Sequence, residues 1–422
     1  MHSFRIFIAL NYAIFCFMVV LASLFAICSD DAAAAQFDFR PTIEVSEEFN
    51  DNIFLTPTGK VDDFITSIIP AFSLMHSTSF WTWNIAYAYE YRYFARQTVT
   101  NDTTFTASVN EHTNVFENIF FIDMTETYGR VAQNVAQSYI TKESTFVDQT
   151  DENVFAVTPY LNLISGPSHT VQIGYQYINT WYKSPLSFDT INNGGYLLMG
   201  EPLSSNLSIT GGIQYTRGLN NLYGYFITDI YTGGVYTYAP GSVSFCILGE
   251  YWLHFVGYPN IHHLLWDLGF INHYSTMTLK VETKTSYVDD PSEILRRLDQ
   301  LEVTLTKDQT TRTSLSGIAG WYQYFNPAQD HIEANEYVLT GKLRHVLTPR
   351  WTLSGEISNT IYQDFVQNAD MYIYQIITSF EHYLKKDLRL TLGYEYTYTY
   401  SPNIYSENSR VNQISVALTE LF

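Results

Sequence analysis

Charged side chains of both signs recur at alternate positions of extended segments, opposite to the bulky apolar side chains. In residues 80–93, for example, Glu90 and Arg92 alternate with tyrosines. Successive side chains of a strand point to opposite faces of a sheet, so these two charges share one face. If the sheet closes into a barrel, acidic and basic groups around its water-filled lumen would set up a transverse field that orients polar solutes. The same groups could equally form ion pairs in the wall that satisfy only one another.

We therefore predict a set of lumen-lining residues. They are Glu90, Arg92, Glu250, Asp267, Lys280, Glu282, Lys284, Lys342, Arg344, Glu356, Arg389 and Glu395, with Glu381 in the same class. Small side chains on the same face, at Ala86, Gly174, Gly212, Gly269 and Gly393, are expected to leave room for water. Trp252, also assigned to this face, predicts a constriction or a stacking platform for sugars.

The sequence does not predict catalytic or metal-binding chemistry. Eleven histidines are scattered singly except His262 and His263, whose adjacent side chains would point to opposite faces of a strand and need distant partners to hold a metal. There is no His-Glu-x-x-His motif and no recognisable nucleophile motif. Of three cysteines only Cys246 lies beyond residue 35, which excludes a Cys-x-x-Cys-His haem site there. We expect no enzyme activity, metal or cofactor.

The N-terminus has the features of an export signal. Arg5 precedes an apolar stretch over residues 6–27, and the run Ala33 to Ala35 supplies the small residues that a signal peptidase requires. We predict a signal peptide over residues 1–35 and a mature chain of 36–422. An uncleaved anchor helix is the alternative, and Ile27 disfavours lipid attachment at Cys28. The net charge of −20 argues against nucleic acid as a partner.

Several segments alternate strictly between apolar and small or polar side chains. Residues 80–93, 170–177 and 388–399 each present aliphatic and aromatic groups on one face only. Such a face suits a barrel wall in contact with lipid, and the 34 tyrosines suit aromatic girdles at its rims. The side chains expected to face lipid include Trp83, Ile85, Tyr87, Ile173, Tyr175, Leu390 and Leu392.

The order of segments predicts an all-β fold, a transmembrane antiparallel up-and-down β-barrel. Short turns alternate with longer connections, and the segments between them number 20, within a range of 16 to 22. Weak segments at 104–110, 195–201 and 301–306 keep 18 strands open as an alternative. One connection carries a helix signal over 291–300, with Asp290 as cap, Pro291 at the first position and a stripe of leucines.

The C-terminal segment resembles the signal by which the outer-membrane assembly machinery recognises its clients. Ile414, Val416 and Leu418 alternate up to the terminal Phe422, although Glu420 departs from the pattern. We expect the assembly machinery, outer-membrane lipid and lipopolysaccharide as partners. Polysaccharide or periplasmic secretion proteins are further candidates.

The opening of the mature chain resembles the β-barrel porins of type 2. The resemblance rests on the Asp51-Asn52-Ile53-Phe54 element within residues 44–54, followed by Asp63-Phe64-Ile65-Thr66 in a strand segment that reaches Pro70. Residues of about 40–95 carry the specific part, and the remainder matches only in style. The resemblance implies an outer-membrane protein without catalytic residues, often encoded beside exopolysaccharide or exosortase genes.

Together these features predict a porin-like channel of the outer membrane for the passage of polar solutes. The alternatives are a pore for exopolysaccharide secretion and a barrel that sheathes electron-carrying cytochromes. The alternative that involves no transport is a barrel with a filled lumen and a purely structural role.

Overall fold

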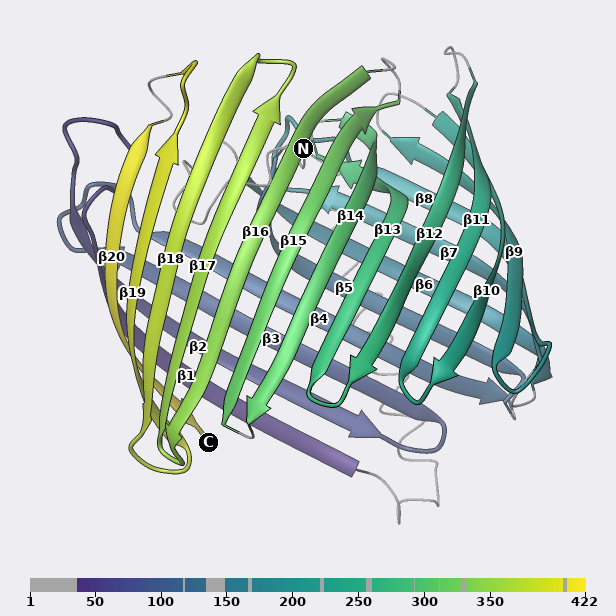
Figure 1. Ribbon diagram of the computed structural model, residues 1–422, viewed down its shortest axis with the longest axis horizontal. Helices are drawn as coiled ribbons and strands as arrows, with labels where there is room; N and C mark the ends of the chain where they lie inside the picture. The colour runs from purple at the N-terminus through teal and green to yellow at the C-terminus, as the bar shows by residue number, and fades with distance from the viewer. Residues whose placement is uncertain are drawn as a thin grey trace, which may run out of the picture.

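Twenty antiparallel strands form one closed barrel (Figure 1) in the computed structural model, which describes residues 36–116, 118–133, 149–165, 169–220, 224–255, 260–291, 293–310, 312–327, 331–404 and 408–422. The strands are β1 (Gln36–Asn50), β2 (Asp63–Ser77), β3 (Trp81–Phe94), β4 (Asp102–Phe116), β5 (Phe120–Ala132), β6 (Gln149–Ser165), β7 (Thr170–Tyr182), β8 (Thr190–Pro202), β9 (Leu207–Asn220), β10 (Gly224–Ala239), β11 (Ser242–Phe255), β12 (Ile261–Tyr274), β13 (Met277–Asp290), β14 (Glu293–Thr310), β15 (Thr313–Asn326), β16 (His331–Thr348), β17 (Trp351–Asp364), β18 (Ala369–Tyr383), β19 (Leu388–Tyr400) and β20 (Ser409–Leu421). Each strand pairs with the next in the chain, and β1 also pairs with β20. The prediction of an all-β antiparallel barrel of 20 strands is confirmed.

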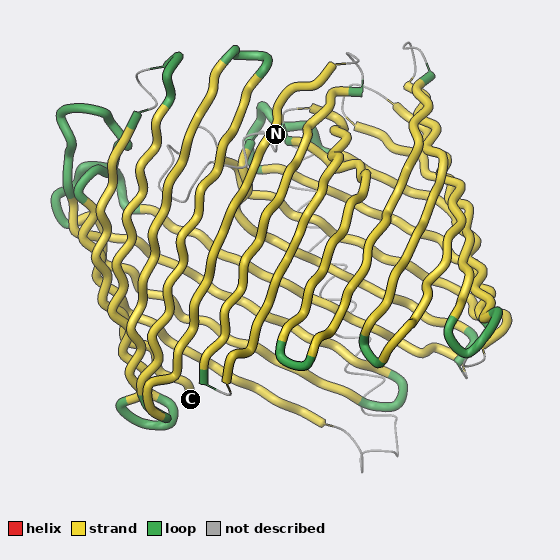
Figure 2. Tube along the Cα trace, in the orientation of Figure 1, coloured by secondary structure: helices red, strands yellow, loops and turns green. Residues whose placement is uncertain are grey.

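The three weak segments that made 18 strands an alternative count all lie within full strands. Residues 104–110 belong to β4, 195–201 to β8 and 301–306 to β14. Strands and short connections make up the described chain (Figure 2), and no helix in these residues is long and apolar enough to cross a membrane. The predicted signal segment, residues 1–35, lies outside the described residues.

The two ends of the barrel differ in their connections. Connections after even-numbered strands are short and gather at one end, the turn end, which lies at the bottom of Figure 1. Those after odd-numbered strands gather at the other end, the loop end, and include one of twelve residues at 51–62. The first residue of β1 and the last residue of β20 both lie at the turn end. An even number of strands requires that arrangement.

The outer face of the barrel is apolar. Directly opposed residues of an antiparallel pair share a face. Leu392 lies opposite Val416, and these side chains are 45% and 44% exposed. Ile173 and Tyr175 are each 46% exposed on the same face of β7. An apolar surface this extensive is stable only against lipid.

Aromatic groups gather on this outer face near the turn end. Trp81 and Trp83, at the start of β3, have ring centroids 5.8 Å apart, and Trp351, the first residue of β17, stacks at 3.7 Å on His382. The Trp81 indole donates a hydrogen bond of 2.8 Å to Glu111. Rings with an apolar body and a polar edge suit the boundary between lipid and water. The turn end therefore carries one of the expected girdles.

The predicted helix over 291–300 is wrong. From Glu293 the chain is extended in β14, whose backbone pairs with β13 on one side and β15 on the other. The leucines that suggested a helical stripe serve three environments. Leu295 is buried with tyrosines, Leu298 packs on a second cluster and Leu301 is 40% exposed on the outer face. Pairing with two neighbours outweighed the local helix signal.

Candidate functional site: the barrel lumen

The inner face can be traced around the whole barrel from the cross-strand pairs. It carries all but one of the predicted lumen-lining residues, namely Glu90, Arg92, Asp267, Lys280, Glu282, Lys284, Lys342, Arg344, Glu356, Arg389 and Glu395, together with Glu381. They do not converge on one site. The strands distribute them over several separate patches of the wall.

Glu250 is the exception. It lies opposite Ile230 and Leu264, which are 49% and 59% exposed on the outer face. Trp252 shares that face, and its indole donates a hydrogen bond of 3.0 Å to Glu250. The prediction that Glu250 and Trp252 face the lumen is therefore wrong. Near the loop end both faces of β11 carry bulky side chains, since Tyr251 and Leu253 are buried on the inner face, so alternation alone could not identify the lipid side.

The adjacent histidines of β12 point to opposite faces, as expected. His262 packs against Trp252 on the outer face, with ring centroids 4.6 Å apart. His263 lies on the inner face, where Nη1 of Arg297 donates a hydrogen bond of 2.9 Å to its Nδ1. Within the described residues no group of three His, Cys, Asp or Glu side chains is arranged to hold a metal ion.

Most inner-face charges form local ion pairs. On β13, Glu282 pairs with Lys280 and also with Lys284, at 3.4 Å. On β16 and β17, Lys342 lies 3.0 Å from Glu356. Arg344 differs, because it is exposed and forms no hydrogen bond or ion pair with any described residue. It therefore presents a guanidinium to the lumen.

On β18 and β19 the same pattern continues. Arg389 lies 3.7 Å from Glu381, and Gln375 donates a hydrogen bond of 2.7 Å to Glu395. At the loop end Arg92 is only 4% exposed and lies close to the ring of Phe94. Arg389 and Glu381 therefore satisfy one another, Glu395 accepts a hydrogen bond from an amide, and Arg92 lies against an aromatic ring.

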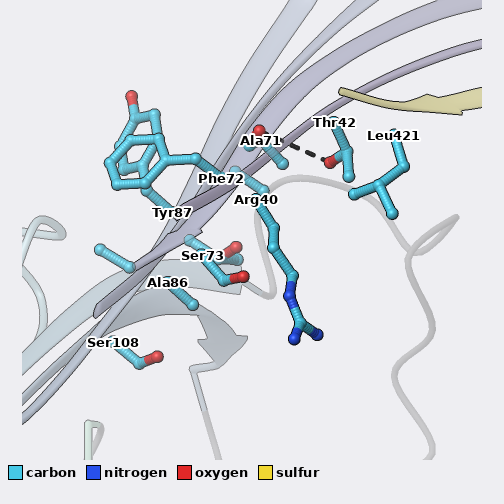
Figure 3. A pocket seen from close by; sticks show the side chains of 12 residues that line it. Arg40, Thr42, Ala71, Phe72, Ser73, Ala86, Tyr87, Ser108 and Leu421 are labelled. Atoms are coloured by element: carbon cyan, nitrogen blue, oxygen red, sulfur yellow. Dashed lines mark hydrogen bonds between the residues drawn. The ribbon is translucent and has the colours of Figure 1, made fainter. Parts of the chain in front are cut away.

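Two hollows indent the inner wall. One of about 530 Å³ lies over β1 to β4, where Thr42, Ser73, Ala86 and Ser108 form a floor of small side chains beside Arg40. Figure 3 shows Arg40 on one side of the ribbon and the rings of Phe72 and Tyr87 on the other. Those rings stack on the lipid side with centroids 5.6 Å apart.

The second hollow, of about 500 Å³, lies over β14 to β18. Lys342, Arg344 and Glu356 line it together with the hydroxyl groups of Ser314, Ser316, Ser354, Ser379 and Thr306. Hydroxyls and charged groups are the side chains that replace water around a polar solute. This hollow therefore has a polar and charged lining.

The four inner-face glycines expected to leave room for water do not do so. A Cβ added at Gly174 would lie 2.3 Å from the Tyr196 ring, one at Gly212 would lie 2.6 Å from the Tyr231 ring, and Phe245 covers Gly269 in the same way. At Gly393 an added Cβ would likewise meet the Ser415 hydroxyl. The expectation of open space at these positions is wrong, because side chains of neighbouring strands occupy it. Ala86, in contrast, does line a hollow.

The loop end of the lumen is packed with side chains. The pairing of β12 with β13 stops at Asp267 and Lys284, and beyond this point the hairpin of β13 and β14 leaves the wall. Its Leu295 packs with inner-face residues of β10 and β11, namely Tyr225, Tyr251 and Leu253. The backbone N–H of Phe188, in the connection between β7 and β8, donates a hydrogen bond of 3.0 Å to the carbonyl of Pro291. The hairpin thus crosses the inner face of several strands.

Buried charges accompany this hairpin. Arg296 forms an ion pair with Glu333, and these side chains are only 3% and 8% exposed. Arg297 donates a hydrogen bond of 2.8 Å to Asp299, which also accepts one of 2.7 Å from Thr285. Removing one partner of a buried ion pair typically costs about 3–5 kcal/mol. These contacts hold the hairpin in one position.

No protein-family model and no curated protein matches this chain. Solved structures do match its fold. The siderophore receptor PirA from Pseudomonas aeruginosa is 11% identical with a TM-score of 0.51, and the match covers 91% of this chain and 80% of that one. The FrpB iron transporter from Neisseria meningitidis (F5-1 variant) is 8% identical with a TM-score of 0.51, over 91% of this chain and 83% of that one. A ferric enterobactin receptor, PfeA, of P. aeruginosa is 9% identical with a TM-score of 0.51, over 91% and 80%.

The chain is a β-barrel of the Gram-negative outer membrane. At these identities the likeness shows the fold alone, and the resemblance to β-barrel porins of type 2 stays a prediction. Short turns of outer-membrane barrels face the periplasm and longer loops face outward. The turn end is thus the periplasmic end, and the hairpin packs at the extracellular end.

Proposed function

We propose that this protein is an outer-membrane channel through which polar solutes pass. The observation that carries the proposal is the second hollow in the inner wall, lined by Arg344, Lys342 and five hydroxyl side chains. An exposed guanidinium without a partner among the described residues stabilises nothing in the wall that the structure describes. Its position is understandable if the lumen holds water and solutes.

The packed hairpin makes this channel a gated one. Leu295 and its tyrosine partners occupy inner-wall space at the extracellular end, whereas both hollows lie nearer the turn end. A barrel of this strand number has an interior wide enough for an aqueous channel unless something fills it. Solutes pass when the hairpin moves off the inner face of β10 and β11. The fold shared with receptors and an iron transporter is compatible with transport.

Liposome swelling tests the proposal. Vesicles containing the purified barrel are diluted into isotonic solutions of arabinose, sucrose or raffinose, and the swelling rate is followed by light scattering. The proposal predicts swelling that slows as the solute becomes larger, and faster swelling for Leu295→Ala. Absence of swelling for both proteins, with each shown to be folded, would reject a channel.

A further inference from the structure

A row of aromatic side chains crosses the inner wall from β4 to β10. The row consists of His112, Phe121, Tyr160, Tyr196 and Tyr231, one residue from each of β4, β5, β6, β8 and β10. His112 stacks on Phe121 at 5.4 Å and Phe121 on Tyr160 at 5.2 Å, with the ring planes within 25° of parallel. We refer to these five residues as the aromatic row.

Glycines on the intervening strands make two of the tyrosines lie flat against the wall. The ring of Tyr196 covers Gly174 of β7, and the ring of Tyr231 covers Gly212 of β9, where any Cβ would collide with it. One face of each ring therefore contacts backbone. Both tyrosines remain only half-buried, so the opposite ring face is open to the lumen.

The strand positions of Tyr160 and Tyr196 are farther apart than one sugar ring. Tyr160 and Tyr196 lie on either side of Gly174, directly opposite it on β6 and β8. Neighbouring strands are about 4.8 Å apart, so these two positions are about 10 Å apart. The row would contact successive units of an extended molecule. A compact ion would meet one ring at a time.

Side-chain amides lie between the rings on the same face. Gln172 and Gln176 flank Gly174, and Gln214 on β9 lies directly opposite Tyr196. Gln172 donates a hydrogen bond of 3.2 Å to Asn162, and Gln214 donates one of 3.3 Å to Gln176. Gln172 and Gln176 have further donor and acceptor capacity, whereas Gln214, whose amide nitrogen also donates to Thr216, keeps acceptor capacity only. Neutral hydroxyl groups can use both.

Cationic side chains are absent from this part of the inner face, as far as the structure describes it. Between Asp102 and Tyr274 the described basic residues are Arg130 and Arg217, which lie on the outer face, and Lys183, which lies in a connection. The inner-face Lys and Arg residues that line the second hollow, Lys342 and Arg344, lie on β16 instead. An anionic chain would therefore be attracted away from the aromatic row.

We propose that the aromatic row binds neutral oligosaccharides. The apolar C–H face of each sugar ring packs on an open tyrosine face, and its hydroxyls exchange hydrogen bonds with the glutamine amides. This inference rests on the proposed function, because it names the solute class of the same lumen. It also explains why glycine stands beneath Tyr196 and Tyr231, since any larger residue would tilt the ring edge-on to the lumen.

Binding of maltohexaose to the purified barrel in detergent tests the inference without any transport step. Isothermal titration calorimetry is expected to show saturable binding by wild type and binding at least about tenfold weaker for Tyr196→Leu, which corresponds to about 1.4 kcal/mol. Tyr196→Phe keeps the ring face and is expected to bind like wild type. Tyr215→Leu removes an outer-face tyrosine that is 50% exposed and serves as the matched control.

Gly174→Ala tests the ring orientation while every aromatic side chain is kept. Its new Cβ would displace the Tyr196 ring, so binding is expected to weaken about as much as in Tyr196→Leu. Gly200→Ala is the control on the same inner face, because the nearest side-chain atom there is 3.8 Å from the added Cβ. The heat-dependent shift of the barrel on gels shows that each variant is folded.

The outcomes separate this inference from the proposed function. The inference would be overturned if wild type did not bind maltohexaose. It would also be overturned if wild type, Tyr196→Leu and Gly174→Ala bound equally well, even if Gly174→Ala were less stable. Choline binding in place of maltohexaose would overturn it too, because it would indicate a site for organic cations. Binding without any solute flux would instead reject the channel and leave the saccharide site standing.

Discussion

Tyr251 and Tyr287 stack with ring centroids 3.7 Å apart and planes within 10°. Tyr251 lies on the inner wall of β11, whereas Tyr287 belongs to the face of β13 that carries the outer-face residue Val281 lower in the same strand. These rings can meet only because the upper part of β13 has left the wall and folded into the lumen. The stack therefore marks the point where the hairpin of β13 and β14 covers the inner wall. Such a pair contributes about 0.5–1.5 kcal/mol beyond its buried area.

Leu295→Ala is expected to loosen the hairpin. Truncating a buried leucine costs about 2–5 kcal/mol, and here the loss falls on contacts with Tyr225, Tyr251 and Leu253. Single-channel recording should show a larger open fraction than wild type. Leu301→Ala, on the lipid side of the same strand, is the control and should leave gating unchanged. Equal open fractions in all three proteins would argue against the hairpin as the gate.

Arg344→Glu is expected to shift ion selectivity. The guanidinium is exposed in the lumen and has no partner in the part of the chain that the structure describes, so reversing its charge changes the field that permeating ions meet. The reversal potential in a salt gradient should move toward cation preference. Arg350→Glu, at an exposed turn of the same barrel end, should have little effect. An unchanged reversal potential in Arg344→Glu would place this residue off the permeation path.

Glu333→Gln is expected to destabilise the loop end. Glu333 pairs with the buried Arg296 and accepts a hydrogen bond of 2.8 Å from Asn326. Neutralising it leaves a buried guanidinium without its countercharge, a loss of about 3–5 kcal/mol. Urea unfolding followed by tryptophan fluorescence measures the change. A midpoint equal to that of wild type would show that this pair does not hold the loop end together.

Asp51, which follows β1, makes the folding stability depend on pH where β1 pairs with β20. Burial alone raises the pKa of Asp51, but hydrogen bonds of 2.7 and 2.8 Å from Asn412 on β20 and one of 3.1 Å from Lys60 hold that pKa below its ordinary value. Because the folded pKa is depressed, the stabilisation is present above the ordinary value of 3.8 and is lost as pH falls through the folded pKa.

Asp51→Asn is therefore expected to be less stable than wild type at pH 7, with the difference shrinking below about pH 4. Urea midpoints across this pH range measure it. Asp62→Asn, whose carboxylate pairs with Arg96 at the surface, is the comparison. A gap between Asp51→Asn and wild type that stays constant down to low pH would contradict the assignment.

Strand number and the lipid-facing side chains could be predicted from the sequence because alternation sets both. A one-residue slip at Leu392 would place Arg389 and Glu395 in lipid, so the register of β19 has one answer. The same reasoning placed Glu250 on the wrong face. Both faces of β11 carry bulky side chains at this point, because the hairpin covers its inner face.

The hairpin and the aromatic row could not be predicted, because both depend on contacts between strands distant in sequence. Leu295 packs against residues about 40 to 70 positions earlier in the chain, and no local pattern encodes that contact. The glycines on the inner face did carry a signal for the row. Gly174 and Gly212 indicate close approach of another group as well as open space, and cross-strand register was needed to choose.

Ionic current through the purified barrel in a planar lipid bilayer tests the central claim most directly. The account predicts stepwise current in wild type, interrupted by closures, and longer openings when Leu295→Ala frees the hairpin. If neither protein conducts at any voltage, although both are folded and inserted, the barrel is not a channel for polar solutes.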